Sequence, residues 1–312
     1  MGDDRLRSNV SLTAEEAISR VTPWRARGDI AITTLAGGIT NLNYKLSVGG
    51  QSFVLRIGGA ETELLGIDRR CEHLAHRAAA SLGIAPEIFF LIEPELYLVT
   101  RFIDGRPLSP QEIGRPDNLQ RVAAAMRAYH LLTPIQCPFS PFRTVEAYAE
   151  TSIRHGVELP ADFADLMGQL RQIEGALLEA PASIRLCHND LLNANFLDDG
   201  ALRILDWEYA GMGDLFFDLG NFAVHHELSD EQDQMLLESY FGAPQAAAQF
   251  AHLQLMKIAS DFREAMWGML QIGISQLDFD FRGYADRHFA RMLTHLQDPR
   301  FESWLSQAAE QL

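Results

Sequence analysis

The spacing of hydrophobic and polar positions changes about a third of the way along the chain. Before that point, short apolar runs predict strands at 30–35, 43–48, 52–57, 87–92 and 96–102. Gly49-Gly50 is a turn signal that makes a hairpin of the second and third strands. Thr13 and Glu16 form a capping box for a short helix, and a longer helix over 68–82 ends at Gly83. We therefore expect a five-stranded antiparallel sheet with one main helix.

The remainder of the chain has mostly the period of amphipathic helices. We expect such helices over 117–132, 163–178, 215–225 and 231–241, and over at least part of 246–274. The predicted fold class is α+β, with two lobes: an N-terminal sheet lobe over residues 1–103 and a larger, mostly helical C-terminal lobe over residues 104–312. A hinge near 102–105 would join them, and small ligands usually bind in a cleft between lobes.

Composition and charge narrow the class of ligand. The 312 residues are 47% hydrophobic, which is enough for a large core. The 26 basic residues face 42 acidic ones, giving a net charge of −16. A field of this sign disfavours nucleic acids and anionic membrane surfaces and mildly favours a small cationic substrate. We therefore expect a small-molecule ligand and no nucleic acid or membrane partner. Independently of the charge, we expect a monomer or homodimer.

Three cysteines, Cys71, Cys137 and Cys187, stand far apart with no CxxC pair. Their spacing and odd number argue against a disulfide framework or a zinc site and favour a reducing compartment. Residues 1–10 are polar without an apolar core, and no run approaches the roughly 18 apolar residues that a membrane span needs. The expected location is the cytoplasm.

The segment 186–209 carries the most informative polar residues: His188, Asp190, Asn195 and Asp206. Phosphoryl transfer needs a carboxylate to orient the attacking hydroxyl and oxygen ligands to hold magnesium on the nucleotide phosphates. Asp190 suits the first task, whereas Asn195 and Asp206 suit the second. The alternative is that all of them are ordinary loop and strand-end residues, as Asp and Asn often are.

A hairpin would explain how the two magnesium ligands meet. A two-residue turn at Asp199-Gly200 would place Asn195 opposite Ile204, with Asp206 on the same face as Ile204. Diagonal neighbours of this kind are roughly 7 to 8 Å apart at the backbone, so their side chains could share one cation. The pattern therefore predicts a magnesium site on a hairpin.

The expected sheet offers candidate nucleotide contacts. Gly37 and Gly38 lie between the first two strands, where backbone N–H groups could approach phosphates, although a plain hairpin turn would also use such glycines. Arg56 ends the third strand, and Glu72 on the following helix could hold it in an ion pair, as a lysine and a glutamate do in protein kinases. Arg101 is a second candidate cation for the nucleotide.

These motifs together resemble the choline/ethanolamine kinase family, within the protein-kinase-like group that includes aminoglycoside phosphotransferases. The resemblance runs from about residue 35 to residue 291 and is sharpest at His188-Asn189-Asp190 with Asn195, at DWEYAG (206–211) and at FDLGN (217–221). The glycines 37 and 38 with Asn41, and IDR (67–69) with Glu72, are also similar to bacterial members.

The resemblance implies a protein-kinase-like fold and ATP-dependent phosphorylation of an amino alcohol. It assigns the catalytic base to Asp190 and the Mg²⁺ ligands to Asn195 and Asp206. It implies that Glu208 supports the metal or acceptor site, that Asp218 braces the catalytic loop and that His188 is structural. The nucleotide-binding residues that we expect on this basis are Gly37, Gly38, Thr40, Asn41, Arg56, Glu72, Arg101, Phe102 and Ile103.

The segment 260–291 is similar to the choline-binding segment of that family. Trp267, Phe279 and Tyr284 fall on its aromatic positions, and Asp280 is a nearby carboxylate that could help to hold a quaternary ammonium. Aromatic residues on a late helix are also typical of a core. Glu264 occupies a position where eukaryotic choline kinases have a second tryptophan, and it would suit an amine that keeps N–H donors, such as ethanolamine.

Two other functions are compatible with the same residues. An aminoglycoside or thiamine kinase would use the same catalytic loop with a different acceptor pocket. A non-catalytic kinase-like protein could bind a nucleotide or an amine without turnover, although the complete set of Asp190, Asn195 and Asp206 argues against it.

Overall fold

The five predicted strands are present and form one N-terminal sheet. Our computed structural model describes residues 12–25, 29–35, 41–59, 61–177, 183–244 and 246–310. The five strands are antiparallel in the order β1-β2-β3-β5-β4. Gly49 and Gly50 turn β2 into β3 with φ values of 55° and 76°, as predicted. The strands are β1 (Ile30–Leu35), β2 (Asn41–Val48), β3 (Gln51–Gly58), β4 (Ile88–Ile92) and β5 (Tyr97–Arg101).

A small hydrophobic core lies between this sheet and the first helices. The capping box of Thr13 and Glu16 begins α1 (Ala14–Ser19), as the sequence predicts. The 3₁₀ helix η1 (Thr22–Trp24) follows, and the Trp24 ring packs 5.0 Å from Phe53 between ring centroids. This packing buries one face of the sheet.

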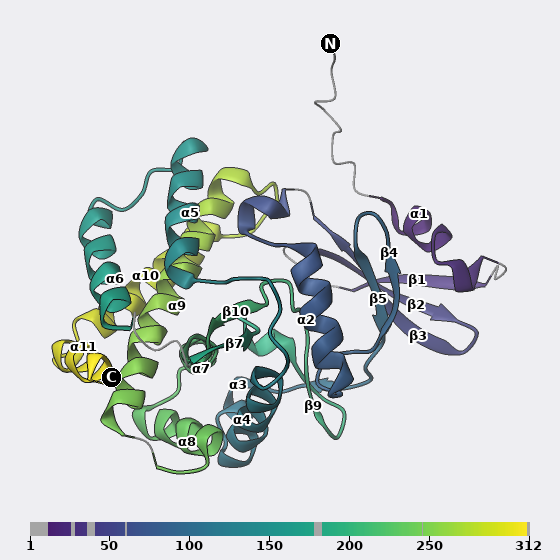
Figure 1. Ribbon diagram of the computed structural model, residues 1–312. Helices are drawn as coiled ribbons and strands as arrows, with labels where there is room; N and C mark the ends of the chain where they lie inside the picture. Colours follow the sequence, from purple (N-terminus) through teal and green to yellow (C-terminus); the bar gives the residue numbers. More distant parts are fainter. Residues whose placement is uncertain are drawn as a thin grey trace.

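The helix α2 (Arg69–Ser81) packs into the core of the helical part rather than into that of the sheet. Asp68 caps its N-terminus, and Gly83 follows its end with a φ of 71°. Ala75 and Ala79 are fully buried in the larger core, so α2 lies between the sheet and the other helices (Figure 1). The proposed division into residues 1–103 and 104–312 stays a prediction, because this hydrophobic core crosses it.

The C-terminal part is mostly helical and surrounds α9 (Ala247–Ile274), which is buried from Ala251 to Gln271. Helices α5, α7, α10 and α11 contact α9, whereas α4 packs on α8. The predicted helices are present. The other elements of this part are β6 (Arg106–Pro107), α3 (Pro110–Ile113), α4 (Pro116–His130), α5 (Pro141–Arg154), α6 (Phe163–Leu177), β7 (Ile184–Cys187), η4 (Asn193–Asn195), β8 (Phe196–Asp198), β9 (Leu202–Ile204), β10 (Gly211–Asp214), α7 (Leu215–His225), α8 (Asp230–Phe241), α10 (Phe281–Leu296) and α11 (Phe301–Ala309). In the N-terminal segment, the 3₁₀ helix η2 (Thr62–Leu65) precedes α2.

The hairpin in the catalytic segment forms, but its predicted register is wrong by one residue. Phe196 of β8 lies opposite Ile204 of β9, and residues 199–201 connect the strands. The reason lies in the turn, where the Asp198 carboxylate accepts the N–H of Gly200 at 3.0 Å and stabilises a three-residue connection.

Neither predicted magnesium ligand lies within the paired strands. Asn195 ends η4, and its carbonyl accepts the N–H of Leu205 at 2.8 Å. Asp206 follows β9 with a left-handed φ of 60°. The predicted diagonal pairing of Asn195 and Asp206 on one face of the hairpin is therefore wrong.

Cys71 and Cys137 form a disulfide, which corrects the expectation drawn from their spacing. Cys71 lies in the first turn of α2, and Cys137 precedes Pro138, which bridges to Met212 of β10. Tertiary packing brings together two residues that are 66 positions apart, and no local motif could show it. Cys187 is a free, buried cysteine. No helix in the described part of the chain has the length and apolar character needed to span a bilayer.

We expect the disulfide to raise stability, because it closes a loop of 66 residues in the unfolded chain. The chain-entropy relation gives about 4 kcal/mol for such a loop. The double variant Cys71→Ser/Cys137→Ser should unfold at a lower urea concentration than the wild type. A reductant should lower the midpoint of every protein that keeps the disulfide and leave that of the double variant unchanged. Cys187→Ser is the control variant, and identical wild-type midpoints with and without reductant would contradict the prediction.

Candidate active site

The loop that carries Asp190 is held by three hydrogen bonds to two partners, Asp218 and Tyr209. Asp218, in the first turn of α7, accepts the backbone N–H groups of His188 at 2.8 Å and of Asn189 at 2.7 Å. Asn189 has a left-handed φ of 66°, and its side chain donates to the Tyr209 carbonyl at 2.9 Å. A non-glycine residue holds such a conformation only where its surroundings fix it. The loop that precedes Asp190 is therefore rigidly defined.

Asp218 also accepts hydrogen bonds from two side chains at the end of α4. It accepts the Tyr129 hydroxyl at 2.6 Å and His130 Nε2 at 3.0 Å, and it is fully buried. Burial alone would raise the pKa of Asp218, but these partners hold it below its ordinary value. The ionised carboxylate therefore supports the loop from within the core.

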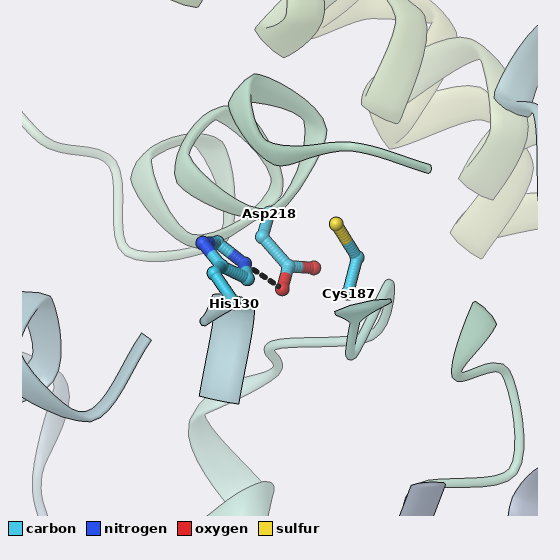
Figure 2. A group of neighbouring side chains, drawn as sticks. All are labelled: His130, Cys187 and Asp218. Carbon is cyan, nitrogen blue, oxygen red and sulfur yellow. Dashed lines mark hydrogen bonds and ion pairs between the residues drawn. The ribbon is translucent and has the colours of Figure 1, made fainter. Parts of the chain in front are cut away.

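His130, Cys187 and Asp218 lie together, as Figure 2 shows, with potential ligand atoms within 4.8 Å of one another. This donor set does not fit a resident metal. One oxygen of Asp218 already accepts bonds from His188, Tyr129 and His130, and the other accepts the Asn189 N–H. Burial also raises the pKa of Cys187 well above its ordinary value, which favours the neutral thiol over the thiolate that binds metals.

His188 bridges the loop to the end of the hairpin. Its Nε2 lies 2.8 Å from the Leu205 carbonyl, and its Nδ1 accepts the N–H of Asp190 at 3.2 Å. Burial lowers the pKa of His188 to about 4, so the ring is neutral at neutral pH with its proton on Nε2. Both ring nitrogens are occupied by backbone groups.

Asp190 lies at the wall of a cavity of about 180 Å³. It is 7% exposed, and Asn195 Nδ2 donates to its backbone carbonyl at 2.8 Å. Burial raises the pKa of Asp190, and the guanidinium of Arg263, 3.6 Å from its carboxylate, opposes that effect. The Asp190 side chain thus faces a small cavity that the Arg263 guanidinium also lines.

A second cavity of about 630 Å³ adjoins the first. Both cavities are lined by Asn43, Ala194, Asn195 and Asp206. Asn195 and Asp206 therefore both lie at the junction of the two cavities. The larger cavity is bounded by β3, β5 and the segment after β5, with Phe102, Ile103, Leu197 and Leu205 among its apolar walls.

The predicted pairing of Arg56 with Glu72 is present, and Arg56 also forms an ion pair with Asp206. Arg101 lines the larger cavity as well, but its guanidinium lies 4.9 Å from the Phe53 ring centroid and donates to Gln51 at 3.0 Å. Arg56 is therefore the predicted cation that the structure places beside Asp206.

Arg69, in the first turn of α2, links three polar side chains near Arg56 and Asp206. It donates to Glu72 at 2.7 Å, to Glu208 at 3.2 Å and to the Asn41 side chain at 2.9 Å. Asn41 in turn donates to Glu208 at 2.8 Å. Burial raises the pKa of Glu208, as does the nearby Asp206 carboxylate, whereas the two arginines oppose the shift. Gly37, Gly38 and Thr40, which the sequence predicted as nucleotide contacts, lie outside the described residues.

The far wall of the smaller cavity comes from α9 and α10. Trp267 donates from Nε1 to the Tyr209 hydroxyl at 3.1 Å, and its ring lies 5.3 Å from that of Tyr284. The Tyr284 hydroxyl donates to Glu264 at 2.5 Å. Burial alone would raise the pKa of Glu264, but Arg263 and His225 hold it well below its ordinary value.

Two predicted acceptor residues do not line this cavity in the described part of the chain. Phe279 is 41% exposed, with its ring 6.2 Å from that of Tyr284. Asp280 caps α10 by accepting the N–H of Gly283 at 2.8 Å, so its carboxylate has a local structural partner.

The cavity wall is strongly acidic. Asp190, Asp206, Glu208 and Glu264 face a single guanidinium, that of Arg263, for a formal balance of −3. Arg56, Arg69 and Glu72 lie behind this wall. When they are included, five carboxylates and three guanidiniums give a formal charge of −2. Such a space favours a cation over a neutral or anionic molecule.

Arg69, Tyr209 and Arg263 belong to this site, although sequence reasoning gave them no role. Arg69 stands three residues before Glu72 on one helix, a spacing that could have suggested an ion pair. Arg263 precedes Glu264 directly, and adjacent opposite charges among the apolar residues of a helix are a usable signal.

The chain is similar to known phosphotransferases. The model of the phosphotransferase enzyme family matches residues 31–250. Ethanolamine kinase 1 of Mus musculus is 26% identical over 304 residues, which cover 84% of this chain and 82% of that protein.

Solved structures extend the similarity to the fold. A choline/ethanolamine kinase family protein from Mesorhizobium loti is 30% identical with a TM-score of 0.80, over 94% of this chain and 97% of that one. Choline kinase LicA from Streptococcus pneumoniae shares the fold with a TM-score of 0.75 at 21% identity, over 90% of this chain and 98% of that one. The predicted α+β, kinase-like architecture is confirmed.

Proposed function

Because this chain belongs to the phosphotransferase enzyme family and to the choline/ethanolamine kinase family, we propose that it transfers the γ-phosphoryl group of ATP to the hydroxyl of a small amino alcohol. The observation that carries the proposal is the pair of cavities that meet at Asn195 and Asp206, the smaller one acidic and partly aromatic. Ethanolamine and its methylated relatives, up to choline, are the acceptors that match this chemistry.

The larger cavity is assigned to the nucleotide. Its apolar walls, including Phe102 and Ile103, suit an adenine ring, and its volume of about 630 Å³ is typical of a ligand site. Arg56, at the junction with the smaller cavity, is the cation that would meet the phosphates. Arg56 would then exchange its contact with Asp206 for one with phosphate oxygens while Glu72 holds it from behind.

Asn195 and Asp206 would hold the magnesium ion. An amide oxygen and a carboxylate are hard oxygen donors of the kind that this ion prefers, and both side chains lie where the two cavities join. When bound, the ion would neutralise charge on the phosphate oxygens. Glu208, held by Asn41 and Arg69, would support Asp206 from the adjoining position.

Asp190 would act as the base at the acceptor hydroxyl. The hydroxyl oxygen forms a bond to the γ-phosphorus, the bond from that phosphorus to the bridging oxygen of ADP breaks, and the hydroxyl proton passes to the Asp190 carboxylate. His188, Asn189 and Asp218 hold the loop and do not touch the reacting atoms in this scheme.

The acceptor cavity favours an ammonium group that keeps N–H donors. Glu264 and the Tyr284 hydroxyl can accept such donors, whereas the rings of Trp267 and Tyr209 can hold methyl groups by cation–π attraction. We therefore rank ethanolamine above choline as the substrate.

An acceptor panel tests the function. Purified protein with ATP and magnesium should release ADP when ethanolamine, its methylated derivatives or choline is added, and mass spectrometry should find the phosphate ester. Ethylene glycol is the uncharged control, and EDTA should stop the reaction. Turnover on kanamycin or thiamine instead would identify another acceptor class. A nucleotide-dependent thermal shift without any turnover would identify a binding protein.

Glu264→Gln should separate the two kinds of ammonium group. We expect the KM for ethanolamine to rise at least about 10-fold, because a hydrogen bond to a charged group contributes about 1.5 to 3 kcal/mol. The KM for choline, which has no N–H donor, should rise less, and the KM for ATP should stay unchanged. Initial-rate kinetics on both acceptors measure this, and equal losses would contradict the ranking.

The cellular setting is part of the proposal. ATP as co-substrate supports action in the cytoplasm. A monomer or homodimer stays a prediction. The net charge of −16 gives no support to a nucleic acid or anionic membrane partner.

A further inference from the structure

Arg263 on α9 is a fully buried cation in contact with the catalytic loop. It is 1% exposed, and its Nη1 donates to the backbone carbonyl of Asn189 at 2.6 Å. The same guanidinium lies 3.6 Å from the Asp190 carboxylate and 2.8 Å from that of Glu264. Its carbon lies 4.7 Å from the centre of the Tyr209 ring. Burying an arginine is costly unless its partners compensate, so this arrangement calls for a reason.

The carbonyl that Arg263 holds belongs to the strained residue directly before Asp190. The N–H of Asn189 is fixed by Asp218, and its side chain is fixed by the Tyr209 carbonyl. Arg263 supplies a third bond, and this one comes from the helix that also carries Glu264 and Trp267. The peptide that leads into Asp190 is thereby tied to the wall of the acceptor cavity.

We infer that Arg263 is a positioning residue: its guanidinium holds the Asn189 peptide and the Asp190 carboxylate in register with the acceptor-binding side chains of α9. The inference rests on the proposed function, since it concerns the distance between the base and the bound hydroxyl. A plainer role would be to neutralise Glu264 in the core. The two roles make different demands on the side chain, because neutralisation needs only a positive charge, whereas positioning needs the planar fork.

Arg263→Lys separates these roles. Lysine keeps the charge beside Glu264 but cannot reach the Asn189 carbonyl, Asp190 and Glu264 with fixed geometry. Positioning predicts that kcat falls about 100-fold, as expected for a misplacement of about 1 Å, while the KM values for ATP and ethanolamine change less than about threefold. Neutralisation predicts a kcat near that of the wild type.

A matched control is available on the next helix. Arg291 of α10 is paired with Asp261 through Nη2 at 2.6 Å and lies outside both cavities in the described part of the chain. Arg291→Lys makes the same chemical change and should leave kcat unchanged. Thermal unfolding of both variants shows whether either has lost its fold.

Two further measurements keep the inference testable if lysine is poorly tolerated or the acceptor differs. Arg263→Ala should regain kcat when methylguanidine is added, because the cavity wall gives the small cation access to the vacated position. Amide hydrogen exchange of a peptide spanning 186–192 should quicken in Arg263→Lys and not in Arg291→Lys.

The outcomes separate the two claims. If the wild type shows no turnover with any acceptor of the panel, the proposed function is rejected. Amide hydrogen exchange alone then decides whether Arg263 holds the loop. Wild-type turnover together with a full kcat and unchanged exchange in Arg263→Lys overturns the inference and leaves the function standing.

Discussion

Replacing Asp190 with Asn is expected to lower kcat by about 10³-fold while ATP binding persists. The substitution keeps the size of the side chain and removes its ability to take the hydroxyl proton. Asp190 lines the acceptor cavity and does not line the nucleotide cavity in the described part of the chain, so the nucleotide contacts should survive. Single-turnover measurement of ADP formation gives the rate, and the shift of the unfolding temperature by ATP gives the binding.

A surface carboxylate provides the control. Asp165 is exposed on α6, and Asp165→Asn should match the wild type in both measurements. Undiminished turnover in Asp190→Asn would refute the proposed base. If Asp190→Asn loses both the ATP-dependent shift of the unfolding temperature and the turnover, Asp190 supports the loop or the nucleotide site rather than the proton transfer.

The elements that could be predicted from the sequence are those set by neighbours along the chain. The helix over 215–225 has its expected bounds, and the hairpin at Gly49-Gly50 forms because these glycines accept left-handed φ values. The capping box at Thr13 works in the same local way. Each depends on side chains within a few residues of one another.

The hairpin near the active site shows the limit of local rules. The sequence predicts a two-residue turn, but the Asp198 and Asp199 carboxylates accept the backbone N–H groups of Gly200 and Ala201, which favours a longer connection. Asn195 and Asp206 still line the same cavities, for a reason other than strand pairing. The Asp280 carboxylate likewise accepts a nearby backbone N–H, that of Gly283, and does not line the cavity in the described part of the chain.

Contacts between distant segments could not be predicted in this way. The Cys71–Cys137 bond and the bond from Arg263 to Asn189, 74 residues away, exist only once α2 and α9 have packed. The resemblance to a family supplied the roles of the predicted residues, but it pointed to no partner for Arg263. Long-range packing therefore decides the features of this site that its motifs leave open.

Asp218→Asn is expected to cause the largest loss of stability among single substitutions in the catalytic loop and its support. The Asp218 carboxylate accepts four bonds, from His188, Asn189, Tyr129 and His130. An amide would present an NH₂ group to some of these donors, and breaking a buried charged network of this kind costs about 3 to 5 kcal/mol. Urea unfolding should show the loss, and kcat should fall as well because the loop before Asp190 is released.

Two variants of residues that contact or lie beside Asp218 test whether its hydrogen bonds, rather than a metal, account for the expected loss of stability. Tyr129→Phe removes one of the four donors and should cost about 1 kcal/mol. Cys187→Ala removes the thiol shown beside Asp218 in Figure 2, and EDTA should leave its unfolding midpoint and that of the wild type unchanged, because the cluster is not a metal site.

The pH dependence has a definite sign. Because the folded pKa of Asp218 lies below its ordinary value, its contribution is present at neutral pH and is lost as the pH falls through that lowered value. Asp218→Asn should therefore flatten the acid limb of the stability curve. An acid limb as steep as that of the wild type, or a variant as stable as the wild type at neutral pH, would show that the loop is held by something other than this carboxylate.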